Sequence, residues 1–127
     1  MGTGEAPACL IVHVIDDDEA VRDAFVRLLR SERLDARAYP SVERFMDEAD
    51  KTMPGCILLD VTMPDIDGMN ALKLLRSTHN ALPVIVVSAH DSLPNQRLAR
   101  SLGAKLYLRK PVDDQALLDA ISWVTAT

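Results

Sequence analysis

The chain has 127 residues, of which 48% are hydrophobic, so it is long enough to bury one core, and a second domain does not fit. Its formal charge of -5, with acidic residues gathered in two blocks, disfavours direct nucleic-acid binding. No apolar run approaches the roughly 20 residues needed to span a bilayer, and the opening MGTGEAPA does not resemble a signal peptide. We therefore expect a cytoplasmic protein without membrane contact.

The first half of the chain alternates between strand and helix patterns. Residues 10–15 form a short apolar run bounded by carboxylates, which is typical of a strand buried on both faces. From Glu19 the apolar period becomes that of a helix. A short strand is expected over 36–39, a helix capped by Ser41 follows, and CILL begins a strand over 56–60.

The second half repeats the same alternation. The remaining predicted elements are, in order, a helix carrying Met69, Leu72 and Leu75, a strand over 83–88, a helix over 94–102 closed by Gly103, a strand over 105–108, and a helix capped by Asp113. Five alternating strand and helix units imply a parallel sheet with right-handed crossovers and helices on both faces.

Polar side chains follow four of the five predicted strands: Asp16 with Asp17, then Asp60, Ser88 and Lys110. Ligands of open parallel sheets bind at the carboxyl ends of the strands, so these residues are expected at one rim. Crowded carboxylates need a cation, and Mg²⁺ suits an oxygen-only set that lacks histidine and cysteine. A lysine and a hydroxyl at the same rim suit a bound phosphoryl group.

Four segments, each after a predicted strand, together resemble the response regulator receiver domain of bacterial two-component systems: VHVIDDDEAVR, LLDVTMPDIDG, VIVVSAHD and YLRKP. The resemblance covers Leu10 to Val124. The expected fold is a flavodoxin-like, doubly wound, five-stranded parallel sheet of order 2-1-3-4-5 with five helices. We expect residues 1–127 to form a single receiver domain, with 1–9 as a flexible N-terminal segment.

The resemblance implies a role for each residue of the acidic site. Asp60 would accept a phosphoryl group. Mg²⁺ would be bound by Asp17, Asp60 and the Thr62 backbone carbonyl, and by Asp16 through a water molecule. Lys110 would pair with the acyl phosphate, held by a Lys110–Pro111 peptide that is typically cis in this family.

The resemblance also implies a switch and its partners. Ser88 would move toward the phosphoryl group and Tyr107 would turn inward behind it, which changes the surface of helix four, strand five and helix five. The phosphoryl donor would be a histidine kinase or a histidine phosphotransfer protein. From the residues themselves, Arg97, Arg100, Lys105 and Arg109 predict a basic surface, and the start of helix five carries Asp113 and Asp114. Two copies could pair these opposite charges on phosphorylation. We expect Thr62 and His90 to tune the lifetime of the phosphoryl group.

Simpler roles and other functions remain open from the sequence. The carboxylates from Asp16 to Glu19 could only cap a helix, Tyr107 could only pack in its strand, and His13 is expected to be a buried, hydrogen-bonded core residue. A hydrolase with an aspartyl-phosphate intermediate would carry its nucleophile near the first strand rather than at Asp60. A flavodoxin-like electron carrier would not have an acidic first turn, and a receiver that is never phosphorylated would not fill all five site positions.

Overall fold

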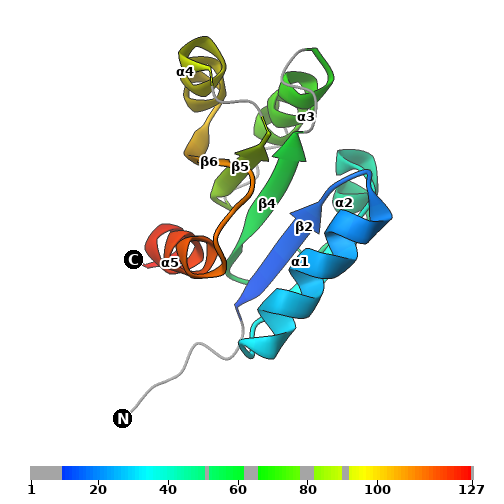
Figure 1. Cartoon of the computed structure of the whole chain (residues 1–127). Coiled ribbons are helices and arrows are strands. Elements are labelled where there is room, and N and C mark those ends of the chain that lie inside the picture. The colour runs from blue at the N-terminus through cyan, green and yellow to red at the C-terminus, as the bar shows by residue number, and fades with distance from the viewer. Residues whose placement is uncertain (1–9, 51, 62–65, 78–81, 90–91, 127) are drawn as a thin grey trace.

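The structure, a computed structural model, describes residues 10–50, 52–61, 66–77, 82–89 and 92–126, and it describes no side chains for 66–69. Within these ranges strands and helices alternate along the chain (Figure 1). In chain order the elements are β2 (Ile11–Ile15), α1 (Glu19–Ser31), β3 (Asp35–Tyr39), α2 (Val42–Glu48), β4 (Gly55–Val61), α3 (Ile66–Ser77), β5 (Val84–Ser88), α4 (Leu93–Ser101), β6 (Ala104–Arg109) and α5 (Asp114–Thr125).

The strands form one parallel sheet in the order β3-β2-β4-β5-β6. Counted along the chain, this is the predicted order 2-1-3-4-5, and the predicted fold class is confirmed. Each strand is connected to the next by a helix, as parallel pairing requires. The carboxyl ends of the strands therefore meet at one edge of the sheet.

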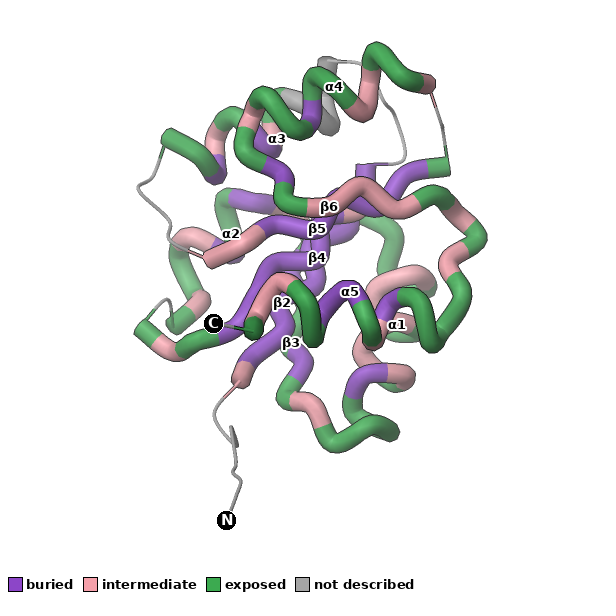
Figure 2. Tube along the Cα trace, turned by 90° about the vertical axis from the view of Figure 1, so that its left-hand side faces the viewer, coloured by how far each residue is buried: buried purple, intermediate pink, exposed green. Residues whose placement is uncertain are grey.

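Helices cover both faces of the sheet, so the buried strands lie between two helical layers (Figure 2). Against one face pack α2, α3 and α4, through side chains such as Phe45, Leu72 and Ala99. Against the other face pack α1 and α5, through side chains such as Leu29 and Leu117. Strands β2, β4 and β5 are buried almost throughout because both of their faces contact helices.

Polar side chains fix where the helices begin. Asp18, Ser41, Ser92 and Asp113 each accept a hydrogen bond from a backbone N–H in the first turn of the helix that follows. The predicted caps Ser41 and Asp113 are confirmed. Helix α4 begins one residue earlier than predicted because Ser92 supplies its cap, with Pro94 in the first turn.

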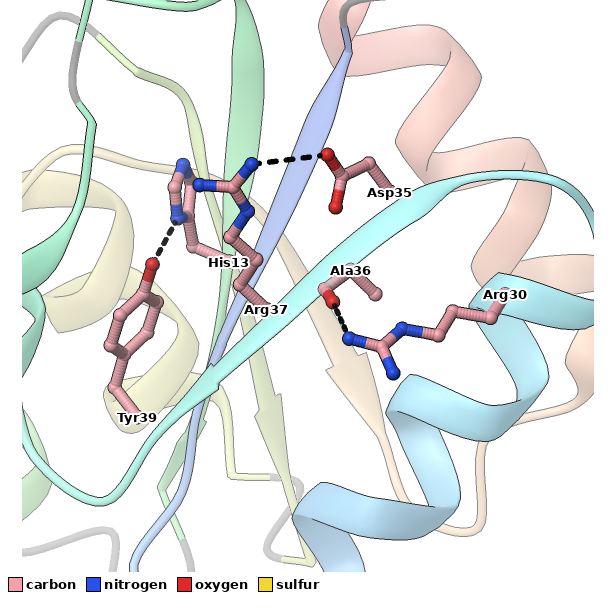
Figure 3. Close-up of polar contacts among 6 residues, drawn as sticks. All are labelled: His13, Arg30, Asp35, Ala36, Arg37 and Tyr39. Carbon is pink, nitrogen blue, oxygen red and sulfur yellow. Dashed lines mark hydrogen bonds and ion pairs between the residues drawn. The ribbon is translucent and has the colours of Figure 1, made fainter.

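His13 is completely buried in β2, as predicted, and its Nδ1 lies 3.1 Å from the Tyr39 hydroxyl of β3 (Figure 3). The same view shows the outer strand β3 held by the Arg30 guanidinium, which donates to the Ala36 carbonyl at 2.9 Å. In the part of the chain that the structure describes, no helix is long and apolar enough to cross a membrane.

Candidate functional site

The five predicted site residues lie at the carboxyl edge of the sheet. Asp16 and Asp17 directly follow β2, Asp60 is next to last in β4, Ser88 ends β5, and Lys110 directly follows β6. The register places Asp60 opposite Val87 and Ser88 opposite both Val61 and Arg109. The arrowheads of β2, β4 and β5 in Figure 1 point toward this edge.

Asp60 and Lys110 form an ion pair between Oδ2 and Nζ. The Asp60 side chain is only 1% exposed, whereas the Lys110 side chain is 23% exposed, so the lysine reaches the carboxylate from the solvent side. A backbone hydrogen bond of 2.8 Å from Lys110 N–H to the Ser88 carbonyl fixes the chain at that point. The Lys110–Pro111 peptide is cis, as predicted.

Asp16 is buried beside Asp60. Burial, followed by a hydrogen bond to the Asp60 carboxyl, raises the pKa of Asp16 from 3.8 to about 8, against the lowering effect of Lys110. Asp16 Oδ1 accepts a hydrogen bond of 2.9 Å from the Asp18 N–H. Apart from the contact between the two carboxyls, Asp16 Oδ2 and Asp60 Oδ1 accept no hydrogen bond from any donor of the described residues. A proton or a cation is needed between these two carboxyls.

Asp17 is exposed and lines a pocket of about 320 Å³ together with Asp16 and Asp60. The beginning of α2 also lines the pocket, with Ser41 and Glu43. Apolar residues of β2, β4 and α3 complete its lining. The acidic site is thus open to solvent on the side where Asp17 stands.

Ser88 and Tyr107 occupy neighbouring strands behind this rim. Ser88 is completely buried. Tyr107 is half-buried in β6 and packs against the core cluster beneath α2, α3 and α4. The structure places Ser88 at the same edge of the sheet as Asp60 and leaves Tyr107 partly accessible to solvent.

Arg22 is a residue of the site region that the sequence did not identify, because helical periodicity assigns it to the polar side of α1. Its guanidinium instead reaches back and donates a hydrogen bond of 2.7 Å to the Asp16 carbonyl. Periodicity predicts the face of a helix on which a side chain begins, but not the direction in which a long side chain bends.

Thr62 and His90, for which roles were predicted, lie outside the described residues, and so does the segment 1–9 that was expected to be flexible. Asp18, which matches no metal-binding position, caps α1 through hydrogen bonds from the Ala20 and Val21 N–H groups. Among the carboxylates from Asp16 to Glu19, for which a simple helix-capping role was considered, Asp18 has that role.

The donors of the site are carboxyl oxygens, which suit Mg²⁺. Among the described residues, no three side chains of His, Cys, Asp or Glu form a group that could hold a metal by themselves. Mg²⁺ is usually bound by only one or two carboxylates, with water and phosphate completing its shell. The unpartnered oxygens of Asp16 and Asp60 fit such a site because a divalent cation would compensate both.

The model of the response regulator receiver domain family matches residues 12–122. The transcriptional regulatory protein FixJ of Azorhizobium caulinodans is 41% identical over 115 residues, which are 91% of this chain and 54% of that protein. The response regulator protein TodT of Pseudomonas putida is 32% identical over 111 residues, 87% of this chain and 49% of that protein. The chain spans about half the length of these curated relatives.

Solved structures agree with these sequence matches. The FixJ-N crystal structure is 28% identical with a TM-score of 0.80, and the match covers 91% of this chain and 93% of that chain. The response regulator StyR is 32% identical with a TM-score of 0.78, and the match covers 91% of this chain and 58% of that chain.

Proposed function

Since the chain belongs to the response regulator receiver domain family and is a phosphorylation-dependent signalling switch, we propose that it receives the phosphoryl group on Asp60. The observation that carries this proposal is the pairing of a buried carboxylate at the end of β4 with Lys110, beside a second buried carboxyl, Asp16. Apart from the neighbouring Asp16 carboxyl, one Asp60 oxygen has no protein hydrogen-bond donor among the described residues, and it is the natural nucleophile.

Receiver domains generally bind Mg²⁺ at their acidic pocket. In this chain we propose that Asp17, Asp60 and the Thr62 carbonyl coordinate it and that Asp16 acts through a metal-bound water. When bound, Mg²⁺ supplies positive charge that stabilises the phosphoryl oxygens. Asp17 suits direct contact because its exposed carboxylate lines the pocket together with Asp16 and Asp60.

In the proposed reaction an Asp60 oxygen attacks the phosphorus of a phosphohistidine, the N–P bond breaks, and the donor nitrogen keeps the electron pair. Lys110, already within reach of Asp60, then pairs with a phosphoryl oxygen, and the Ser88 hydroxyl donates a hydrogen bond to another. These residues orient and stabilise the transferred group. We propose that the chain catalyses only its own Mg²⁺-dependent phosphorylation and slow dephosphorylation, and is otherwise not an enzyme.

Phosphorylation adds a charge of about -1.5 to -2 at this strand end. We propose that Ser88 moves toward the new oxygens, and that half-buried Tyr107 turns further inward into the space released. A contact must differ between the two states to shift their equilibrium, and these two contacts would do so. The output surface would then be α4, β6 and α5.

Two-component membership implies a histidine kinase as a partner. We propose that this kinase or a histidine phosphotransfer protein is the donor, that residues 1–127 form one receiver domain, and that it acts in the cytoplasm. On the output surface Arg97, Arg100, Lys105 and Arg109 are exposed, as are Asp113 and Asp114. Pairing of these opposite charges between two copies would give a dimer on phosphorylation. An unchanged mass in light scattering after beryllofluoride treatment would contradict the dimer.

The phosphoacceptor is tested by incubation with acetyl phosphate and Mg²⁺, followed by mass spectrometry of the intact chain. We expect one added phosphoryl group in the wild-type chain and none in Asp60→Asn. Asp18→Asn is the matched control, because asparagine caps a helix as well as aspartate does, so the added mass should remain. Rapid release of phosphate without an added mass would instead indicate a hydrolase.

A further inference from the structure

Arg22 carries a positive charge at a helix position where a positive charge is unfavourable. It stands in the first turn of α1, where the helix dipole is positive and disfavours a cation. Instead of extending into solvent, its guanidinium bends back, and it donates at 2.7 Å to the Asp16 carbonyl from a partly buried position. A charge-assisted hydrogen bond to a backbone carbonyl is stronger than a neutral one.

This bond completes a set of anchors on Asp16. The Asp16 N–H donates to the Tyr39 carbonyl at 3.2 Å, and Asp16 Oδ1 accepts from the Asp18 N–H at 2.9 Å. Arg22 holds the remaining backbone group, the carbonyl. That carbonyl belongs to the peptide bond that leads into Asp17, so Arg22 fixes the plane from which the Asp17 side chain departs.

Asp17 has no such support of its own. Its side chain is exposed, and no hydrogen bond or ion pair holds its carboxylate among the described residues. The direction of this carboxylate therefore depends on the backbone before it. A metal ligand loses affinity when it must be ordered at the moment of binding, and partners that orient ligands commonly contribute on the order of tenfold or more to metal affinity.

We infer that Arg22 is a positioning residue for Mg²⁺ binding, which holds the Asp16–Asp17 peptide so that the Asp17 carboxylate is directed toward the metal. This inference rests on the proposed function of the acidic site. Arg22 does not touch the metal or the phosphoryl group, and its effect is on the affinity of the site.

The test is calorimetric titration of Mg²⁺ into the whole chain. Arg22→Met keeps most of the apolar stem but removes the donor, and we expect its Mg²⁺ dissociation constant to rise about tenfold. Arg22→Lys keeps a cation and one donor, and the rise should be smaller. Arg27→Met removes an exposed arginine of the same helix, and its dissociation constant should equal that of the wild type.

Acetyl phosphate supplies a second readout. The phosphorylation rate of Arg22→Met should be low at limiting Mg²⁺ and should recover at saturating Mg²⁺, which a general loss of folding would not produce. A purely structural role predicts lower stability in urea with an unchanged Mg²⁺ affinity, and this result would overturn the inference. Should Arg22→Met fail to fold, Arg22→Ala decides, because alanine is the best helix former and has no donor, and wild-type affinity in that variant also overturns the inference.

Failure of the proposed function gives a different pattern. A wild-type chain that binds Mg²⁺ but accepts no phosphoryl group contradicts the proposed role of Asp60, while calorimetry still decides the role of Arg22. A wild-type chain that binds no Mg²⁺ contradicts both.

Discussion

At the scale of single residues, the acidic site without its metal carries a proton on Asp16, beside Asp60. Asp16 is buried against Asp60, and its raised pKa of about 8 means that Asp16 is mostly protonated at neutral pH. The carboxyl of an unfolded chain has a pKa of 3.8, so the folded chain binds the extra proton between these two values. The contribution of this proton to the stability of the metal-free chain is therefore present at low pH and is lost as pH rises through about 8.

Replacement of Asp16 by asparagine should remove this dependence. In EDTA, the free energy of unfolding of the wild type should fall as pH rises from about 5 to 9, whereas that of Asp16→Asn should fall less. The variant should gain relative to the wild type as pH increases, because an amide cannot ionise beside Asp60. Urea denaturation at several pH values measures both curves. Parallel curves would show that Asp16 does not carry the proton.

Cys56 provides a second residue-scale prediction. It is completely buried in β4, and burial raises the pKa of its thiol to about 12. In a Cys9→Ser background, Cys56 should react with a disulfide reagent only as fast as the chain unfolds, and at once in urea, because the thiolate is the nucleophile. Absorbance of the released thiol follows the reaction. Fast stoichiometric labelling of the folded chain would contradict this burial.

The sequence predicted which residues end the strands better than it predicted the side chains around them. Asp16, Asp17, Asp60, Ser88 and Lys110 could be identified because each follows a strand pattern, and parallel strands end at one edge. Arg22 could not be identified, since its role depends on a rotamer that periodicity does not specify. The pairing of His13 with Tyr39 likewise depends on the register between β2 and β3.

At the scale of elements, strand β4 depends on a glycine where it passes β2. A Cβ placed on Gly55 would lie 1.8 Å from the Ile11 carbonyl oxygen, a backbone atom that cannot move without shifting the strand pair. Gly55→Ala should therefore lower the free energy of unfolding by at least about 2 kcal/mol. Gly103→Ala is the comparison, because the nearest atom to its Cβ is a flexible side-chain carbon of Arg76 at 3.9 Å.

The comparison variant should cost about 1 kcal/mol, which reflects the positive φ of Gly103 rather than a clash. Equal losses of unfolding free energy for the two variants in urea denaturation would contradict the close approach of β4 to β2.

The boundaries of the elements were harder to predict than the elements themselves. Strand β4 extends beyond the predicted 56–60 at both ends, because backbone pairing continues where the apolar pattern stops.

At the scale of the whole molecule, alternation of strands and helices was sufficient to predict a parallel sheet with two helical layers. It was not sufficient for the strand order, since many orders satisfy the same alternation. The order 2-1-3-4-5 was expected only once the family resemblance was taken into account, and the sheet has that order. Which helices share a face follows from the order. Strand β6 pairs with the strand that ends in Ser88, and α4 packs against β6.

This adjacency makes the proposed switch testable across the molecule. Beryllofluoride with Mg²⁺ mimics the phosphoryl group, and it should change amide hydrogen exchange in peptides covering Leu93–Ser101 and Ala104–Arg109. Ser88→Ala removes the only proposed hydroxyl contact to the new oxygens, so the change in those peptides should be much smaller although the mimic still binds. Ser122→Ala, an exposed serine of α5, is the control and should respond like the wild type. A full exchange response in Ser88→Ala would mean that the signal leaves Asp60 by a route other than Ser88 and Tyr107.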